Sequence, residues 1–246
     1  MFDFCMRTST LSFQDGLTAL SQYKTIHCSS SQASALSEET MLILNAVIDL
    51  STLTFYQANN SEDPQIQIIA EAEYKSLQNW IDSHKNETPN NWTYCLAAEA
   101  FDWYLAYLPI SQILVKGLLP KNYYLAALEQ DPDMSYALCG YAQWLYYAPG
   151  MVGGGIKAAR TYCEKAVKTA KTDADGFFSH LFFSQILFEQ KDKKGALEHL
   201  DAAEAIQPGS RRIIRFRQMN DAGFSWFEFA RDFEDNRAKL SEPLVN

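Results

Sequence analysis

The sequence predicts an all-α protein, and three observations support this. Apolar residues recur at helical spacing in nearly every segment, whereas the alternation that marks β-strands is rare. The 246 residues include 11 glycines and 8 prolines, which is few for an all-β chain of this length, with its many tight turns. Apolar residues make up 47% of the chain and aromatic residues 13%, enough for a substantial buried core.

The N-terminal region, residues 1–119, is predicted to consist of helices with recognisable start signals. Ser37 is a good N-cap, because its hydroxyl can accept a hydrogen bond from the first turn, where two glutamates follow it. We expect this helix to end near Gln57. Asp63 and Pro64 begin the next helix, since a proline at the first helical position gives up no intrahelical hydrogen bond.

A polar loop, residues 83–91, precedes a helix expected from Trp92 to Leu108. That helix is apolar on most sides, which indicates that it is buried. Pro109 and Pro120 bracket a short segment after it. No run of 18 apolar residues occurs, so we expect no membrane-spanning helix.

Three segments of the C-terminal half share a pattern of small and large residues. The pattern Tyr124-x-x-Ala127-x4-Pro132 matches Leu200-x-x-Ala203-x4-Pro208, and Ala159-x3-Cys163-x-x-Ala166 matches Ala196-x3-Leu200-x-x-Ala203. These residues resemble the second helix of a tetratricopeptide repeat, in which small residues let two helices pack closely and a proline ends the unit. One helix hairpin cannot bury its apolar face alone, so such units stack on one another.

The resemblance covers about residues 120–217. It implies antiparallel helix hairpins stacked as an α-solenoid, with the additional N-terminal helices before them. In the family frame, one repeat begins at Asp133 and the next at Phe177. Residues 218–246 would then form C-terminal capping helices and a tail, in which FSWFEFARDF (224–233) covers the last repeat. We expect one continuous domain.

The segment APGMVGGG (148–155) is longer than the turn of a usual repeat. It looks like the turn of certain bacterial repeat proteins, many of them exported. The whole chain is similar to the repeat-containing T component of TRAP transporters, a periplasmic partner of the substrate-binding protein. A phosphate-loop interpretation fails, because no Lys-Ser/Thr follows the glycines and no strand precedes them. Glycine supplies the positive φ that such a turn needs, and replacing Gly154 should lower stability if that residue holds a positive φ.

The resemblance also implies a binding groove, because the first helices of these repeats line the concave side. The expected groove residues include two aromatic pairs of the kind that binding surfaces favour. The residues assigned to binding from the first two repeats are Tyr141, Trp144, Phe178 and Gln185. The alternative is that the aromatic residues pack against the N-terminal helices instead.

One basic cluster, GSRRIIRFRQMN (209–220), stands out in an acidic chain. Ser210 is expected to cap a short helix, and the repeat frame points Arg212 and Arg215 into the groove. The cluster partly resembles the carboxylate clamp of chaperone-binding repeats, although the asparagines of that clamp are missing here. The alternative is a solvated helix whose arginines pair with nearby acids.

The remaining chemistry of the sequence points away from catalysis. A formal net charge of −9 argues against nucleic-acid binding, which needs a basic face. The five cysteines show no metal-ligand or disulfide spacing. His180 falls where the family has an aromatic residue, so we expect a histidine packed in the core. No spacing singles out a nucleophile or an acid pair, and the sequence indicates no enzyme, no cofactor and no metal.

The sequence therefore predicts a non-catalytic binding or scaffold protein with a protein or peptide partner, associated with transport. The alternative function is a carrier that encloses a small anionic or amphipathic ligand in a helical pocket. The N-terminal residues carry Asp3 and Arg7 and no apolar run of signal-peptide length, which favours the cytoplasm. A periplasmic location stays compatible with the sequence if the N-terminus was trimmed.

Overall fold

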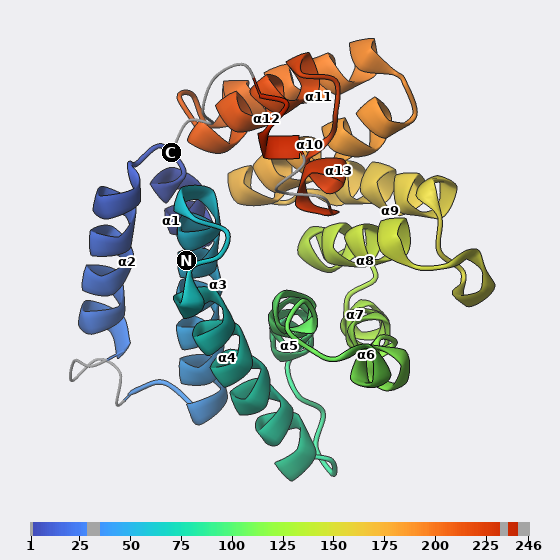
Figure 1. The fold of residues 1–246 in the computed structure, drawn as a ribbon. Helices are drawn as coiled ribbons and strands as arrows, with labels where there is room; N and C mark the ends of the chain where they lie inside the picture. The colour runs from blue at the N-terminus through green and yellow to red at the C-terminus, as the bar shows by residue number, and fades with distance from the viewer. Residues whose placement is uncertain (1, 29–34, 232–235, 241–246) are drawn as a thin grey trace. The chain divides into compact units, whose positions relative to one another are not determined.

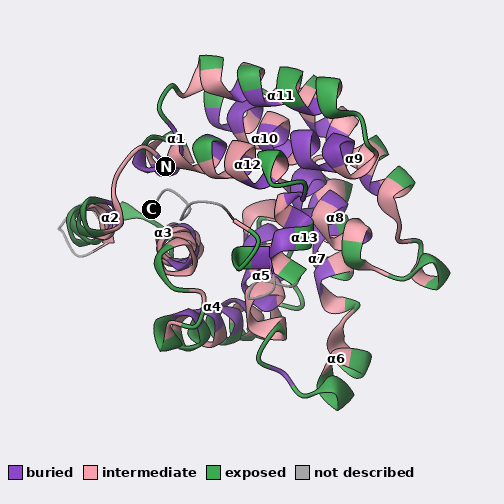
Figure 2. Cartoon of the chain, turned by 45° about the horizontal axis from the view of Figure 1, so that its top comes forward, coloured by how far each residue is buried: buried purple, intermediate pink, exposed green. Residues whose placement is uncertain are grey.

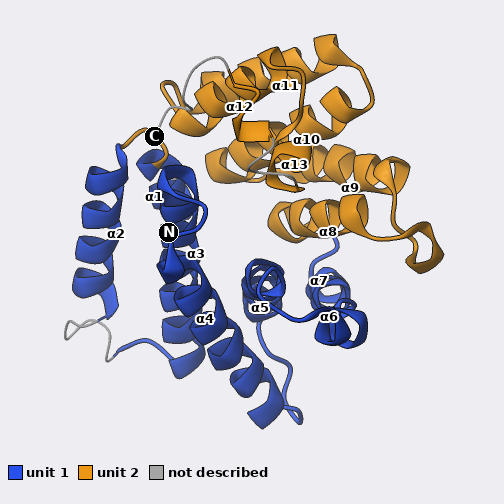
Figure 3. Ribbon diagram, viewed as in Figure 1, with its two compact units in different colours: residues 1–8, 12–132 blue, residues 9–11, 133–246 orange. Residues whose placement is uncertain are grey.

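The computed structural model describes residues 2–28, 35–231 and 236–240, and every regular element in these ranges is a helix (Figure 1). The predicted all-α class is confirmed. Contacts divide the chain into two compact units, shown in Figure 3. Unit 1 comprises residues 1–8 and 12–132, and unit 2 comprises residues 9–11 and 133–246.

Unit 1 contains seven described helices that pack largely in chain order. They are α1 (Phe2–Thr8), α2 (Phe13–Cys28), α3 (Glu38–Asn59), α4 (Pro64–Ser83), α5 (Asn91–Leu105), α6 (Ile110–Lys116) and α7 (Leu119–Gln130). Helix α2 packs on α3, α3 on α4, α4 on α5, and α5 on α7. The middle of α5 is the centre of this core, since Leu96 and Phe101 are completely buried there. Helix α5 is buried as predicted but ends at Leu105, before the expected Leu108.

The helix starts predicted in unit 1 are confirmed. The Ser37 side chain accepts a hydrogen bond from the Thr40 N–H, and α3 continues to Asn59, two residues beyond the expected end. The Asp63 side chain accepts from Gln65 N–H, with Pro64 at the start of α4. These signals depend on residues within one turn of each other, which is why the sequence alone predicts them.

Helix α3 is long and apolar enough to cross a membrane, judged by length and composition only. The mean hydropathy of its most apolar 18 residues is 1.3, and a third of that window is buried inside the protein. The core helix of a soluble protein passes the same test. This one helix therefore assigns no membrane span.

Unit 2 contains a second series of packed helices. They are α8 (Ser135–Tyr147), the short 3₁₀-helix η2 (Gly150–Val152), α9 (Ile156–Thr169), α10 (Asp173–Glu189), α11 (Lys193–Ile206), α12 (Arg211–Asp221) and α13 (Trp226–Arg231). Helix α8 packs on α9, α9 on α10, and α10 on α11, while α12 contacts α10, α11 and α13. The division after residue 132 places α7 in unit 1, because α7 packs on α5, whereas the repeat pattern set a boundary at residue 119.

Small residues allow the helices of unit 2 to approach closely. Ala159, Cys163 and Ala166 are completely buried along one face of α9. The Ser135 hydroxyl of α8 donates to the Ala166 carbonyl of α9 over 3.1 Å, a contact that a larger residue at this position would prevent. Cys163 forms no disulfide, and neither does any of the other four cysteines, so it packs as a small apolar group.

The glycine-rich turn between α8 and α9 differs from the expectation in one respect. Gly153 and Gly155 have positive φ angles of 91° and 129°, whereas Gly154 does not. The positive φ expected of this turn is therefore held by the two glycines on either side of Gly154. Glycine is needed there because a Cβ on Gly154 would lie 1.9 Å from the Ala148 carbonyl oxygen. The sequence could not show this approach, which depends on how the turn folds back.

Candidate binding face of the second unit

One face of α10 and one face of α12 together form the candidate site. Residues at intervals of three and four lie on one side of a helix, and this rule selects Phe178, Phe182, Gln185 and Glu189 on α10. On α12 the same rule selects Arg212 and Phe216. The guanidinium of Arg212 lies 5.5 Å from the centre of the Phe178 ring, which joins the two helices at one end of this face. We call these six residues the α10–α12 face.

Helix α13 of the same chain covers the other end of the α10–α12 face. The Trp226 ring lies 6.0 Å from the ring centres of both Phe182 and Phe216, edge-on to the first and stacked on the second. The Trp226 backbone N–H donates to the Gln185 side-chain oxygen over 2.9 Å. Gln185 is completely buried, and its amide nitrogen donates to the Ser184 hydroxyl. This amide therefore holds α13 in place.

The end of α8 also contacts α13. The Tyr146 ring stacks on Phe227 at 4.6 Å, and the Tyr147 hydroxyl donates to the Phe227 carbonyl over 3.0 Å. The Arg231 guanidinium lies 5.5 and 5.6 Å from the centres of the Tyr146 and Tyr147 rings. Burial, followed by the charge of Glu189, raises the pKa of Tyr146 to about 12. Tyr146 is thus neutral at ordinary pH.

Beyond α12, Phe224 and Phe229 form a buried cluster with Met219, and Trp226 and Leu240 pack against it. The sequence predicted that the aromatic residues of 224–233 would cover the last helices. Phe224 and Phe229 are buried against Met219 of α12, whereas residues 232 and 233 lie outside the described residues. The sequence did not indicate that these aromatic residues would cover the expected groove itself.

Two residues assigned to the groove from the first repeat lie on α8. Tyr141 is buried, stacks on Trp144 at 6.0 Å, and meets the Tyr162 ring of α9 edge-on at 4.7 Å. Trp144 is half-buried. Burial raises the pKa of Tyr141, which keeps its hydroxyl neutral. Part of the Tyr141 ring surface is therefore used for packing between α8 and α9.

The two arginines assigned to the groove have different surroundings. Arg212 is half-buried over Phe178, as described above. Arg215 is also half-buried, and it makes no hydrogen bond or ion pair with any described residue. Burial and the charges of Arg212 and Arg211 lower the pKa of Arg215 to about 10. The charged form of Arg215 is costly in this partly desolvated place next to like charges, and an anion bound beside it would offset that cost.

The neighbouring arginines have partners inside the protein. Arg217 forms an ion pair with Asp201 of α11 at 2.7 Å. The Arg211 guanidinium donates to the Thr10 carbonyl over 3.4 Å, and its backbone N–H donates to the Ser9 carbonyl over 2.9 Å. The expectation that arginines of this cluster pair with nearby acids thus fits Arg217 but not Arg215.

Ser210 precedes α12 as predicted, but it does not cap the helix. Its side chain makes no capping hydrogen bond and instead accepts from the Ser9 hydroxyl over 2.9 Å. The capping prediction is wrong because residues 9–11, which are remote in sequence, pack at this point as part of unit 2. Ser210 is completely buried by that contact.

The structure also brings together two histidines whose spacing in the sequence indicates no contact. The Nδ1 atoms of His180 on α10 and His199 on α11 lie 2.7 Å apart, and Phe183 packs on His199 at 4.6 Å. Burial lowers the pKa of both imidazoles, so one neutral ring donates to the other. His180 is half-buried and not fully in the core. Its contact with a residue 19 positions away follows from the packing of α10 on α11.

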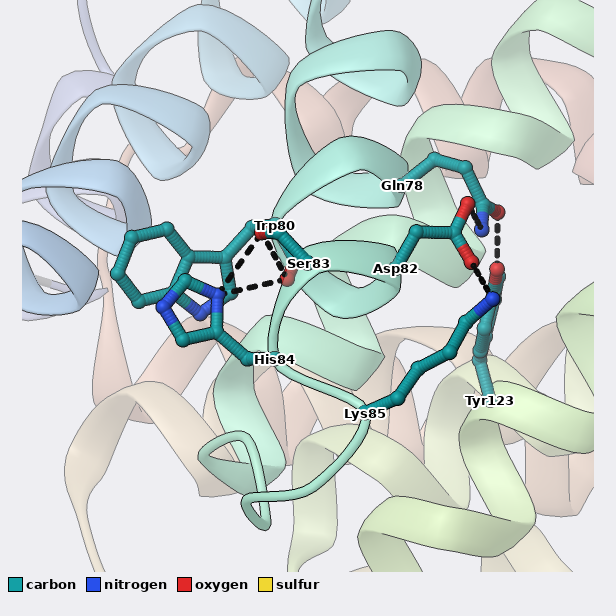
Figure 4. A network of polar contacts seen from close by, with 7 residues as sticks. All are labelled: Gln78, Trp80, Asp82, Ser83, His84, Lys85 and Tyr123. Atoms are coloured by element: carbon teal, nitrogen blue, oxygen red, sulfur yellow. Dashed lines mark hydrogen bonds and ion pairs between the residues drawn. The ribbon is translucent and has the colours of Figure 1, made fainter.

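A polar cluster in unit 1 contains Ser83, His84 and Asp82, and Figure 4 shows how these side chains lie. Both the Ser83 hydroxyl and the His84 Nδ1 atom reach the Trp80 carbonyl, at 3.0 and 2.9 Å. Asp82 turns toward Gln78 and Lys85, away from His84 (Figure 4). The cluster satisfies the carbonyls at the end of α4, and it does not align a base with a nucleophile.

No group of three or more histidine, cysteine or acidic residues is placed to hold a metal ion within the described ranges. Comparisons of the chain with protein-family models, with curated proteins and with solved structures find no match. The α10–α12 face is therefore interpreted from its own geometry.

Proposed function

We propose that this chain is a non-catalytic binding protein of the tetratricopeptide kind, in which α8, α10 and α12 present the binding side of an array of helix hairpins. The pairing of α8 with α9 and of α10 with α11 supports this arrangement. So does the burial of Ala166 and Ala203, the small residues that the repeat pattern places between paired helices. The ligand is a protein or peptide segment that carries a carboxylate.

The proposal depends above all on the surroundings of the Arg215 guanidinium, which is half-buried beside two other arginines. A half-buried guanidinium without an anionic partner among the described residues has unused hydrogen-bond donors in a partly desolvated place. Arg212 lies one turn away on the same helix, and Phe178 offers an apolar ring beside it. A carboxylate placed between the two guanidinium groups would gain charge-assisted hydrogen bonds and relieve their mutual repulsion.

Helix α13 limits where such a ligand can lie. It occupies the Gln185 end of the α10–α12 face, with Phe227 completely buried. The contacts of α13 also show the chemistry that this side of unit 2 offers to a segment of chain. Gln185 accepts from a backbone N–H and Tyr147 donates to a backbone carbonyl, while aromatic rings hold the side chains. A partner would use the Phe178 end, next to the arginines.

The proposal is tested by removing the two arginines together. Arg212→Ala with Arg215→Ala should weaken binding of an acidic peptide about tenfold or more, because one charge-assisted contact contributes about 1.5–3 kcal/mol. Folding should change little, since removing Arg215 also removes a half-buried charge that pairs with no described residue. Candidate peptides come from a pull-down with the full chain, and binding is followed by fluorescence anisotropy.

Arg217→Ala is the matched control, because Arg217 lies on the same helix but is already paired with Asp201. It should leave peptide binding unchanged. The proposal is wrong if the double variant binds the peptide as the unaltered chain does, or if the Arg217 variant loses binding equally. Unfolding of the double variant would show that these arginines stabilise the fold instead.

A further inference from the structure

Helix α6 and its flanking residues expose an unusual amount of apolar surface on unit 1. No residue of α6 is buried, and Figure 2 shows the helix in green and pink only. Leu114 and Val115 are each 80% exposed, and Ile110 is 69% exposed. Tyr107, before α6, is 38% exposed, and Leu118, after it, is 46% exposed. We call these five residues the α6 patch.

The arrangement along α6 gathers these side chains into one surface. Ile110, Leu114 and Leu118 are four residues apart, so they form a stripe along one side of the helix, with Val115 next to it. Pro109 precedes the helix and Gly117 follows it, which keeps it short. Contiguous exposed apolar surface of several hundred Å² is rare on a monomer and marks an interaction site.

The stretch of sequence around the α6 patch, residues 103–128, differs in charge from the chain as a whole. The chain has 30 acidic residues and a formal net charge of −9. None of residues 103–128 is acidic, and the charged residues in that stretch are Lys116 and Lys121. Acidic side chains next to the patch would repel an anionic surface, whereas lysines attract one by about 1 kcal/mol each.

We propose that the α6 patch docks on a lipid bilayer that contains anionic lipids. A short helix with exposed leucine, isoleucine and valine, a tyrosine at its rim and lysines beside it has the composition of an interfacial anchor. Its apolar side chains enter the boundary between headgroups and acyl chains, while Lys116 of the same helix meets the lipid phosphates. This surface lies on unit 1 and does not depend on the function proposed for unit 2.

A stable protein interface fits the patch less well. Standard interfaces bury about 800 Å² on each partner, whereas this surface rests on one helix of seven residues and its two flanks. The largest exposures are those of Ile110, Leu114 and Val115, all on α6 itself. Among residues 103–128, Lys116 and Lys121 are the charged residues with which a second copy of this acidic chain could pair.

The full-length chain is tested by flotation with two kinds of vesicle, one of phosphatidylcholine alone and one with a quarter of phosphatidylglycerol. The unaltered chain should bind the mixed vesicles at least several-fold better than phosphatidylcholine vesicles. Leu114→Glu with Val115→Glu should reduce binding to the mixed vesicles tenfold or more. Because both side chains are 80% exposed, the double variant should keep the melting temperature of the unaltered chain.

The matched control is Ile68→Glu with Leu197→Glu, which adds the same charge at residues that are 57% and 50% exposed on α4 and α11. This variant should bind the mixed vesicles as the unaltered chain does. Equal losses in the two double variants would overturn the proposal, as would failure of the unaltered chain to bind either vesicle. Self-association that the Leu114/Val115 variant abolishes, without vesicle binding, would instead assign the patch to a protein interface.

Discussion

Glu73 on α4 is an acid whose protonation the fold of unit 1 alters. Lys24 of α2 contacts both carboxylate oxygens of Asp49 on α3, at 2.5 and 2.7 Å. Burial, the charge of Asp49 and a hydrogen bond to Asp49 raise the pKa of Glu73 to about 8, although Lys24 acts in the opposite direction. Glu73 is therefore mostly protonated at neutral pH, and the two carboxyl groups share a proton.

This shift predicts how stability depends on pH. The folded state holds the Glu73 proton up to about pH 8, whereas an unfolded chain releases it near its ordinary pKa of 4.5. Folding therefore binds a proton between these values, so the contribution of Glu73 to stability falls as pH rises through this window. Glu73→Gln keeps a hydrogen-bond donor and cannot ionise. At pH 8 it should stabilise the protein by roughly 1–2 kcal/mol, after allowance for partial exposure.

Thermal denaturation at several pH values measures this effect. The melting temperature of Glu73→Gln should exceed that of the unaltered chain at pH 8 and match it near pH 4.5. Glu71→Gln is the control, because Lys75 lowers the pKa of the half-buried Glu71 and this variant should not stabilise the protein at pH 8. A Glu73 variant with the pH profile of the unaltered chain would contradict the proton-sharing interpretation.

At the scale of elements, the turn between α8 and α9 requires glycine at position 154, but because of a close approach to the backbone and not because of a positive φ angle. A Cβ at Gly154 would lie 1.9 Å from the Ala148 carbonyl oxygen, whereas one at Gly150 would meet nothing within 4 Å. Gly154→Ala should therefore cost about 1–3 kcal/mol, and Gly150→Ala should be nearly neutral. Urea denaturation compares the two. Equal stability of both variants would show that the turn relaxes easily. Because this turn lacks the features of a phosphate loop, we also expect calorimetry to show no ATP binding by either variant.

Elements with local signals could be predicted from the sequence. Ser37 and Asp63 cap their helices with bonds that span two or three residues, so α3 and α4 begin where expected. The helical character of unit 2 follows from apolar spacing, whereas the expected pairing of its helices came from the repeat resemblance. By contrast, Ser210 bonds to Ser9, about 200 positions away, and no spacing in the sequence indicates such a contact.

The candidate site was predictable to a similar extent. The repeat frame placed both Phe178 and Arg212 on the groove side, and in the structure the Arg212 guanidinium lies 5.5 Å from the centre of the Phe178 ring. It also assigned Gln185 to a ligand, whereas this amide binds the Trp226 backbone. The frame describes each hairpin by itself, so it could not show that α13 would turn back onto α10. The depressed pKa of Arg215 likewise depends on burial, which only the folded chain provides.

At the scale of the whole molecule, charge distinguishes the two surfaces that we propose from the rest of the chain. The formal net charge is −9, yet no acid occurs between Glu204 and Asp221, where the arginines of α12 lie. The stretch around α6, residues 103–128, also contains no acid. Each stretch therefore contributes only basic charges of its own to an anionic partner, although Glu189 of the α10–α12 face and Asp201 beside Arg217 lie near the arginines.

The central claim is that Arg212 and Arg215 bind a carboxylate, and one measurement tests it most directly. A peptide recovered with the full chain is synthesised twice, with its carboxylate groups free and with the same groups amidated, and both forms are titrated against the unaltered protein. We expect the amidated peptide to bind at least tenfold more weakly, as the loss of a charge-assisted contact predicts. Equal affinities of the two peptides would contradict the claim.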